Sequence, residues 1–355
     1  MVSYHCFRCF STCNCKLSSK GQLTRSCKSS KISPLSAGKE DDSGRMITST
    51  MLGTGATMPL PDRALTAVVL ACGGRSILFD CGEGTQSAAR KAHVSLMKTD
   101  LIALTHYHGD HLFGLPGLLQ SYGCLGRTDA LAITGPEGLE EAMHPILQLC
   151  GPLPFDVRLM PLNPDGSRVC DLLPRWDPEC YLSPVPTRHR VASCGYRFSL
   201  HRAGKFNPSA AENLKIPKPL WSQLQHGRPV TLEDGSEISP EQVLGPSRRG
   251  LSIVFSGDTA PCDTLTAAAA KADLFICEAT YGDDSFSGQA EKYGHCTFSQ
   301  AAQTAADASV SRLWLTHFSQ VMKNPEEYLM NARALFPSAV CGSDGISITL
   351  RFAEE

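Results

Sequence analysis

Four potential metal ligands crowd into one short segment, Thr105-His106-Tyr107-His108-Gly109-Asp110-His111, which directly follows the apolar run 101–105. Alternate residues of an extended segment point the same way, so His106 and His108 can bind one ion. Asp110 and His111, beyond the turn that Gly109 allows, can face a second ion. Imidazole and carboxylate ligands suit zinc best, with manganese or iron as alternatives. Burying three imidazoles and an acid without a cation would be costly, so the segment predicts a metal site.

Two complete metal sites need more ligands than this segment supplies, and three later residues stand in suitable positions. His189 lies between two arginines, Asp258 follows the apolar run 252–255, and His317 follows the run 312–316. Loops that follow buried strands are where active-site residues usually collect. Each of the three, taken singly, would more often be structural. Their assignment as ligands therefore depends on the cluster at 106–111.

Elements that could position these ligands begin at residue 46. Apolar runs and turn residues predict strands at 46–52, 65–71, 76–80, 101–105, 131–134, 252–255, 274–277, 312–316 and 346–352. Helical patterns occupy 85–93, 137–150, 264–271, 298–307 and 325–335. The region 151–250 between the two halves is irregular. Two β/α halves predict an α/β protein with sheets packed face to face and helices outside.

Composition limits the classes of partner. The 355 residues carry a formal net charge of −2 and are 42% hydrophobic, which suits one large domain or two closely joined halves. An RNA partner would need a local positive patch. No apolar run approaches the roughly 20 residues that cross a bilayer, so no membrane partner is expected. Sixteen cysteines without a signal-peptide pattern favour a reducing compartment.

The N-terminal segment, residues 1–45, differs from the rest. Its first 38 residues contain no Asp or Glu, seven Lys/Arg occur through Lys39, and serine is abundant. Such a composition predicts disorder and is typical of an organellar transit peptide, which favours the plastid or mitochondrion. The alternatives are a disordered tail or a chain that starts at Met46, with the cytoplasm or nucleus as location. The catalytic domain is expected at 46–355.

The order of the candidate ligands, together with motifs around them, resembles a known family. His106-x-His108-x-Asp110-His111 followed by His189, Asp258 and His317 resembles the metallo-β-lactamase superfamily. Further segments resemble its short-form tRNase Z members: Leu52-Gly53-Thr54-Gly55, Phe79-Asp80-Cys81-Gly82-Glu83-Gly84-Thr85-Gln86, Leu112-Phe113-Gly114-Leu115-Pro116-Gly117, His189-Arg190-Val191, Glu278-Ala279-Thr280, Tyr293-Gly294-His295-Cys296-Thr297 and Leu315-Thr316-His317-Phe318-Ser319. This resemblance covers residue 47 to the C-terminus. It implies a four-layer αβ/βα sandwich with a dinuclear site at one sheet edge.

The resemblance also implies a role for each site residue. One zinc would be held by His106, His108 and His189, the other by Asp110, His111 and His317, with Asp258 bridging and two Zn²⁺ per subunit. Asp110 would take a proton from the attacking water. His295, supported by Glu278, would donate a proton to the leaving oxygen. The family's usual His-Glu-Ala-Thr and His-Ser-Thr appear here as Cys277-Glu278-Ala279-Thr280 and His295-Cys296-Thr297, which keep the functional Glu and His.

The activity implied is removal of the 3′ trailer from precursor tRNA, leaving a 3′-hydroxyl on the tRNA and a 5′-phosphate on the trailer. A homodimer, in which the arm of one subunit serves the site of the other, is implied as well. The alternative is a hydrolase of the same fold that acts on another phosphodiester or on a small ester or thioester. A non-catalytic RNA-binding protein is a third reading, disfavoured by the complete ligand set. Pairing of Glu278 with His295 favours the nuclease.

The resemblance also implies a tRNA-binding arm at about 200–232. Between residues 188 and 249 there are ten Lys/Arg and five Asp/Glu, and phosphate contacts need such an excess. The family's Gly-x-Pro-x-Gly-Pro core appears as Lys215-Ile216-Pro217-Lys218-Pro219, one residue shorter and without glycines, so the tip of the arm departs from the pattern. The residues expected to bind RNA are Arg63, Lys205, Lys215 and Lys218.

Overall fold

The computed structural model describes residues 45–162, 176 and 179–353. The disorder predicted for residues 1–45 therefore falls almost wholly outside the described residues. Within these described ranges, no helix combines the length and the apolar character needed to cross a membrane.

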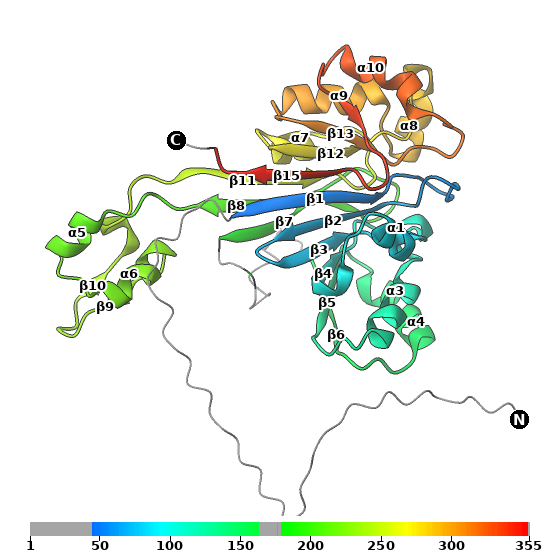
Figure 1. Cartoon of the computed structure of the whole chain (residues 1–355). Helices are drawn as coiled ribbons and strands as arrows, with labels where there is room; N and C mark the ends of the chain where they lie inside the picture. The colour runs from blue at the N-terminus through cyan, green and yellow to red at the C-terminus, as the bar shows by residue number, and fades with distance from the viewer. Residues whose placement is uncertain (1–44, 163–175, 177–178, 354–355) are drawn as a thin grey trace, which may run out of the picture. The chain divides into compact units, whose positions relative to one another are not determined.

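Seven strands form the first β-sheet, in the order β15-β1-β2-β3-β4-β5-β6 (Figure 1). They are β15 (Ser347–Arg351), β1 (Met46–Gly53), β2 (Ala67–Cys72), β3 (Arg75–Phe79), β4 (Thr99–Ala103), β5 (Leu131–Gly135) and β6 (Val157–Pro161). Strands β15 to β3 pair antiparallel and strands β3 to β6 pair parallel. Apolar side chains of the helices α1 (Thr85–Lys91), α3 (Leu115–Cys124) and α4 (Leu139–Cys150) pack with one face of this sheet.

The second sheet has six strands, in the order β14-β13-β12-β11-β8-β7. They are β14 (Val340–Cys341), β13 (Leu313–Thr316), β12 (Leu274–Glu278), β11 (Arg248–Phe255), β8 (Cys194–Arg202) and β7 (Cys180–Pro186). The helices α7 (Asp263–Ala269), α8 (Ser287–Tyr293), α9 (Phe298–Asp307) and α10 (Leu329–Arg333) follow these strands along the chain. A capping box of Thr297 and Gln300 fixes the start of α9.

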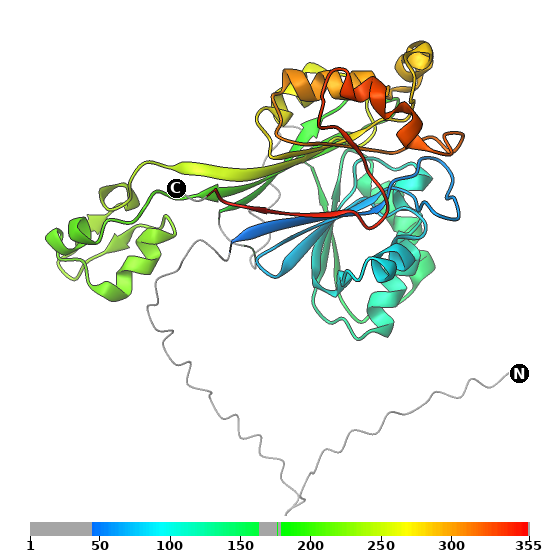
Figure 2. The ribbon, with the colours of Figure 1, turned by 45° about the horizontal axis from the view of Figure 1, so that its top comes forward.

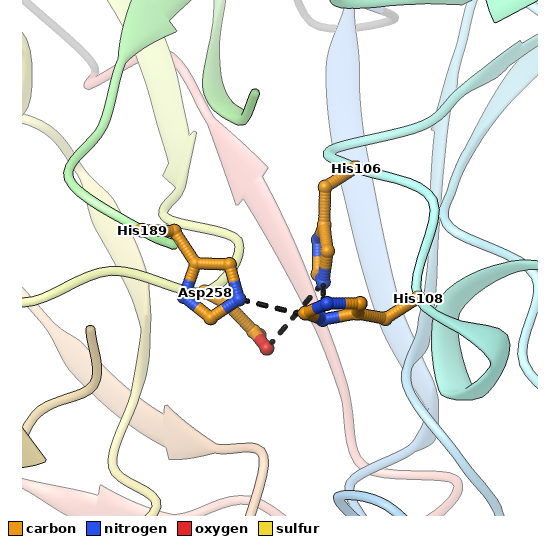
Figure 3. A group of neighbouring side chains, drawn as sticks. All are labelled: His106, His108, His189 and Asp258. Carbon is orange, nitrogen blue, oxygen red and sulfur yellow. Dashed lines mark hydrogen bonds and ion pairs between the residues drawn. The ribbon is translucent and has the colours of Figure 1, made fainter. Parts of the chain in front are cut away.

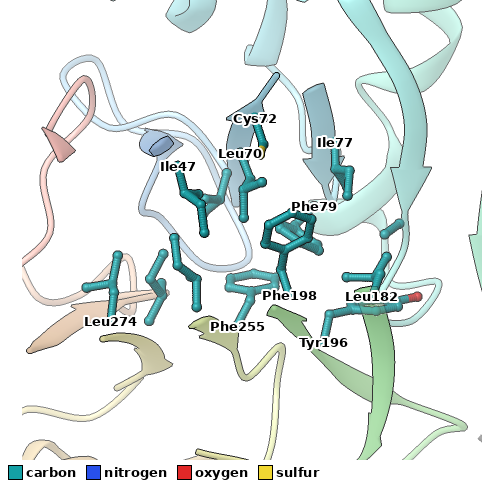
Figure 4. Packing of buried hydrophobic residues seen from close by; sticks show 14 of the residues in the cluster. Ile47, Leu70, Cys72, Ile77, Phe79, Leu182, Tyr196, Phe198, Phe255 and Leu274 are labelled. Carbon is teal, nitrogen blue, oxygen red and sulfur yellow. The ribbon is translucent and has the colours of Figure 1, made fainter. Parts of the chain in front are cut away.

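The two sheets face one another across a shared hydrophobic core. Figure 4 shows side chains of the first sheet pointing toward those of the second, and Figure 2 shows helices on the outer sides. The Phe79 ring lies 5.6 Å, centroid to centroid, from the rings of both Tyr196 and Phe255. Such aromatic pairs contribute about 0.5–1.5 kcal/mol each beyond the area they bury. The expected four-layer αβ/βα sandwich is confirmed.

An arm occupies residues 203–247, between the end of β8 and the start of β11 (Figure 1). It contains α5 (Pro208–Asn213), α6 (Lys218–Gln225), β9 (Val230–Thr231), β10 (Glu237–Ile238) and the 3₁₀ turn η4 (Pro240–Gln242). A small core of its own is formed by Ala211, Ile216, Leu224, Val230, Ile238 and Val243. The arm extends past the expected boundary at 232, because the β9–β10 hairpin and Val243 complete this core.

The region 151–250, expected to be irregular, contains the strands β6, β7 and β8 in addition to the elements of the arm and the start of β11. Strand β7 was not predicted because its prolines at 184 and 186 argue against a strand. It lies at the edge of its sheet, where proline is tolerated. Alternate burial of Tyr196, Phe198 and Leu200 marks β8 as a strand with one face on the core. Helix α3 was also not expected, because Pro116 and Gly117 resemble breakers. Proline in the first turn of a helix costs little.

The remaining short elements connect these parts. They are α2 (Gly109–Leu112), η2 (Leu96–Lys98), η5 (Asp284–Phe286) and η6 (Pro325–Tyr328).

Candidate active site

The segment 105–111 leaves the end of β4 and brings two imidazoles against a third from the second sheet. His106 is fully buried, and its Nε2 lies 2.9 Å from His108 Nδ1. His189 follows β7 and places its Nε2 3.4 Å from the same His108 nitrogen. Figure 3 shows these rings converging with Asp258. Ligand atoms of the four residues all lie within 4.8 Å of one another.

A second group of ligand atoms lies beside the first. His111 is fully buried in α2, and its Nε2 lies 3.2 Å from His317 Nε2, which follows β13. Asp110 Oδ2 lies 3.8 Å from His111 Nε2 and 3.5 Å from His317 Nε2. These three residues also satisfy the spacing for a single cation. The structure thus brings all seven expected ligands together at one edge of the sandwich.

Asp258 stands between the two groups. Its Oδ2 lies 3.7 Å from His106 Nε2, whereas its Oδ1 lies 3.4 Å from His111 Nε2 and 3.3 Å from His317 Nε2. Oδ1 is buried and has no hydrogen-bond partner among the described residues. A buried carboxylate oxygen without a donor is costly, and ring nitrogens that face one another need something between them. Divalent cations between these atoms would satisfy both requirements, so the residues fit a metal pair.

In four of the five ligand histidines, the ring nitrogen that points away from the cluster has a partner. Thr105 Oγ1 lies 3.0 Å from His106 Nδ1, and the carbonyl oxygen of Gly294 lies 2.8 Å from His189 Nδ1. Asp80 Oδ2 lies 2.7 Å from His111 Nδ1, and Thr280 Oγ1 lies 2.9 Å from His317 Nδ1. Such partners fix the ring orientation and the tautomer of metal-binding histidines.

Asp80 belongs to a motif that resembles the family, and no separate role was expected for it. It directly follows β3, is fully buried, and accepts hydrogen bonds from Thr105 N (2.8 Å) and Thr105 Oγ1 (2.9 Å). Its φ of 55° is unusual for a residue other than glycine. The sequence signal for a role in the site was the position of Asp80 directly after β3. The segment that contains His111 follows β4, the neighbouring strand, so the two residues lie at the same edge of the sheet.

His295 and Glu278 form a hydrogen-bonded pair at the edge of the cluster. His295 Nδ1 lies 2.8 Å from Glu278 Oε1 and 4.0 Å from Asp258 Oδ2. Burial lowers the pKa of His295, but the negative charge of Glu278 and its hydrogen bond outweigh burial and raise the pKa to about 9. The pair is therefore suited to hold a proton near neutral pH.

The Glu278 carboxylate is itself held by several donors. It accepts from Thr259 N at 3.0 Å, from Thr280 Oγ1 at 2.9 Å and from Cys296 N at 3.1 Å. Cys296, where the related pattern has Ser, donates its thiol to the carbonyl oxygen of Thr259 at 3.0 Å. The substitution therefore keeps a small donor in place.

Asp110 is positioned from the opposite side. The backbone N–H of Thr57 donates to Asp110 Oδ2 at 2.7 Å. Burial raises the pKa of Asp110, but its hydrogen bond with His317 and the charge of His111 outweigh burial and lower the pKa below the usual range. Asp110 is thus an ionised carboxylate, able to act as a ligand or to attract a proton.

The residues expected to contact RNA divide into two kinds. Lys205, Lys215 and Lys218 are exposed on the arm. Arg63 is buried, and its guanidinium donates to the carbonyl oxygens of Met322 (3.1 Å) and Lys323 (3.2 Å). This burial favours a structural role for Arg63 in holding the loop after His317, in place of the expected contact with RNA.

Positive charge in the region 188–249 is distributed unevenly. The arm itself, residues 203–247, carries four Lys/Arg and five Asp/Glu. All five acidic residues of the region 188–249 therefore lie on the arm. Six of the ten basic residues of this region lie outside the arm: Arg188, Arg190, Arg197, Arg202, Arg248 and Arg249. The excess of basic over acidic residues, which was taken to support an RNA-binding arm, therefore lies on the strands and loops beside the arm.

Two family models match parts of the chain. Residues 47–137 match the model described as anti-Pycsar protein Apyc1, and residues 221–318 match the model described as beta-lactamase superfamily domain.

Curated relatives match over most of the chain. The ribonuclease Z of Lachnospira eligens is 36% identical over 312 residues, which cover 87% of this chain and 100% of that protein. The ribonuclease Z of Clostridium tetani is 39% identical over 313 residues, which cover 86% and 99%. Among solved structures, the short form of human tRNase Z is 27% identical, with a TM-score of 0.59, and covers 85% of this chain and 98% of that one. The metallo-beta-lactamase fold protein YhfI of Bacillus subtilis, 19% identical with a TM-score of 0.61 over 86% and 99%, shares the fold.

Proposed function

This chain belongs to the ribonuclease Z family of hydrolytic endoribonucleases, and we propose that it removes the 3′ trailer from precursor tRNA. The cut would leave a 3′-hydroxyl on the tRNA and a 5′-phosphate on the trailer. One observation carries the proposal: the His295–Glu278 pair lies beside the two groups of metal ligands. A poor leaving group such as a ribose 3′ oxygen needs both charge neutralisation at phosphorus and a proton donor.

The site binds divalent metal, and we propose that each subunit holds two zinc ions. One would be held by His106, His108 and His189, the other by Asp110, His111 and His317, with one oxygen of Asp258 directed at each. Imidazole and carboxylate donors suit zinc, whereas manganese or iron would also accept this set. When bound, such a pair supplies an activated water for attack and neutralises negative charge on the phosphate.

The protein's own residues supply the proton transfers. Asp110, ionised and fixed by Thr57 N, accepts a proton from the attacking water. His295 donates a proton to the departing 3′ oxygen, and Glu278 holds the ring in place and keeps it protonated. The partners behind the ligand rings keep the donors aimed at the cluster without rearrangement during the reaction.

Incubation with a 3′-extended precursor tRNA tests this function. Purified, metal-loaded protein should cut at one position, just after the discriminator nucleotide, and end mapping should find a 3′-hydroxyl on the tRNA. Bis-p-nitrophenyl phosphate serves as a small phosphodiester in parallel. Hydrolysis of that compound without a cut in the tRNA would contradict the proposed substrate while leaving the metal chemistry intact.

We also propose that the protein is a homodimer in which the arm of one subunit contacts RNA bound at the site of the other. The family resemblance supports this arrangement, as do the exposed lysines of the arm. Analytical ultracentrifugation of the full chain should give twice the 38.3 kDa of one chain. A single species of 38.3 kDa, the mass of one chain, would contradict the dimer.

The segment 1–45 is proposed to direct the protein to the plastid or mitochondrion. Its basic, serine-rich and acid-poor composition supports this proposal. A fluorescent protein fused after residue 45 should enter one of these organelles, whereas cytoplasmic or nuclear fluorescence would contradict the proposal.

A further inference from the structure

A basic pocket lies beside the arm, away from the metal ligands. Its volume is roughly 770 Å³, and its lining includes five cationic side chains and one acidic one: Arg197, Arg202, Arg248, Arg249, Lys271 and Asp273. The hydroxyls of Ser309 and Ser311 complete one side. A concentration of cations around one open pocket, on a chain of net charge −2, marks a place where anions would gather.

The cationic side chains of the pocket differ in how strongly they interact with other groups of the protein. Arg197 donates to Ala268 O, and its second amino group donates to Ser252 Oγ at 3.0 Å, so Arg197 holds the wall and contributes fixed charge. Arg202 stacks over the Phe352 ring at 4.8 Å. Arg249 is different, because its side chain is 70% exposed in a surface ion pair with Asp273. Surface pairs of this kind contribute little, so Arg249 can turn to another anion at small cost.

Lys271 provides a second accessible cation. It is exposed and lies in the turn between α7 and β12, with a φ of 54°. Its backbone N–H donates to the carbonyl oxygen of Ala308 at 2.8 Å, which ties this turn to the one containing Ser309. The backbone thus places the base of the Lys271 side chain at the rim of the pocket.

The pocket lies along the same two strands that lead to the metal site. Strand β11 starts at Arg248 beside the pocket and ends at Phe255, three residues before Asp258. Strand β8 starts at Cys194, whose N–H donates to the carbonyl oxygen of Thr105 at 2.9 Å, and ends at Arg202. The pocket lining continues along the strands to Arg197 and Ser252, so about three residues of β11, roughly 10 Å, remain between the pocket and the end of the strand near Asp258. A site that flanks the metal ligands in this way suits a polyanion longer than one nucleotide.

We propose that this pocket binds the sugar-phosphate backbone of the RNA substrate at a distance from the cut, through Arg249 and Lys271. This inference rests on the proposed function for the identity of the RNA. It places a phosphate contact on the strands that carry the arm, in addition to the contact proposed for the exposed lysines of the arm. Backbone contacts of this kind position a structured RNA by its shape and charge.

The test uses the double variant R249A/K271A of the full, metal-loaded chain. Fluorescence anisotropy with mature tRNA, which has no trailer left to cleave, should show a Kd raised about tenfold, with a salt slope reduced by about one for each residue removed. The catalytic efficiency with bis-p-nitrophenyl phosphate should be unchanged, because that compound does not reach the pocket. A Kd equal to that of the unaltered protein would overturn the proposal.

A matched variant removes the same charge from the arm. K215A/K218A should raise the Kd for tRNA on its own, and its combination with R249A/K271A should raise the Kd by about the product of the two separate factors. A combined variant that binds as well as K215A/K218A alone would overturn a separate contact at the pocket. The charge-conserving variant R249K/K271R should restore most of the affinity. Failure of the unaltered enzyme to cleave precursor tRNA would contradict the proposed function alone, since the anisotropy measurement does not require cleavage.

Discussion

The metal-binding edge and the arm hold their side chains in different ways. At the edge, buried rings such as His106 and His111 are fixed by partners behind them, and Asp258 reaches both groups. On the arm, the lysines lie exposed above a small core that contains Leu224 and Ile216. One region depends on the position of individual atoms, whereas the other offers a surface. Single substitutions should therefore have large effects at the edge and small ones on the arm.

The largest effect is expected for Asp258→Ala. This change removes the side chain that lies between both ligand groups and leaves their imidazoles facing one another. We expect a loss of at least about a thousandfold in cleavage of precursor tRNA and a lower metal content. Elemental analysis and single-turnover kinetics measure the two effects. Normal metal content with normal cleavage would refute a bridging role for Asp258.

A smaller and more selective loss is expected for His295→Ala. Cleavage of precursor tRNA should fall by about a hundredfold to a thousandfold, because the 3′ oxygen leaves without a proton. Bis-p-nitrophenyl phosphate should be affected far less, since nitrophenolate is a good leaving group. An equal loss with both substrates would assign His295 a structural role.

The same pair predicts a pH dependence. The proton donor must be protonated, so the rate should fall as the pH rises through the pKa of His295, which Glu278 raises to about 9. Glu278→Gln removes the negative charge and lowers this pKa, so the falling limb of the kcat–pH profile should move to lower pH. If the falling limb of the profile stays at the same pH in Glu278→Gln, the group that titrates there is not His295.

Asp80→Asn should have an intermediate effect. The amide keeps the shape of the side chain but removes the charge that faces His111 Nδ1 at 2.7 Å. Loss of such a partner typically costs about 10–100-fold in metal affinity or activity. A competitive chelator titration measures the affinity. A change below twofold would leave Asp80 with a role in folding only.

The smallest catalytic effect is expected for Leu224→Ala in the core of the arm. Truncation of a buried leucine costs about 2–5 kcal/mol, but the arm has its own core, so the cost should fall on the arm alone. Thermal unfolding of the sandwich and hydrolysis of bis-p-nitrophenyl phosphate should stay near their original values. Leu274→Ala, in the core between the sheets, is the control and should lower the melting temperature of the whole domain. Similar melting curves for the two variants would show that the arm does not unfold independently of the sandwich.

These regions also differ in how far the sequence predicted them. The segment 106–111 and the position of Asp258 after a strand carried local signals, because strand ends and ligand spacing are short-range properties. The boundary of α9 was predicted as 298–307, since Thr297 and Gln300 mark its start. The role of Asp80 and the burial of Arg63 depend on contacts with distant segments, which no local pattern reveals. Charge counted over residues 188–249 could not show that the acids and the bases lie on different parts of the fold.

The two ends of the arm lie next to each other, so the arm can change in length without moving the strands that carry it. Strands β8 and β11 are antiparallel neighbours, and Phe206 pairs with Leu244 where the chain leaves and returns. Residues added or deleted between these two points would leave the strand register untouched, and the cost of closing a longer loop grows only slowly with its length. His189 and Asp258, on either side of the insertion, would keep their separation, so this part of the gene can grow or shrink without disturbing the catalytic edge.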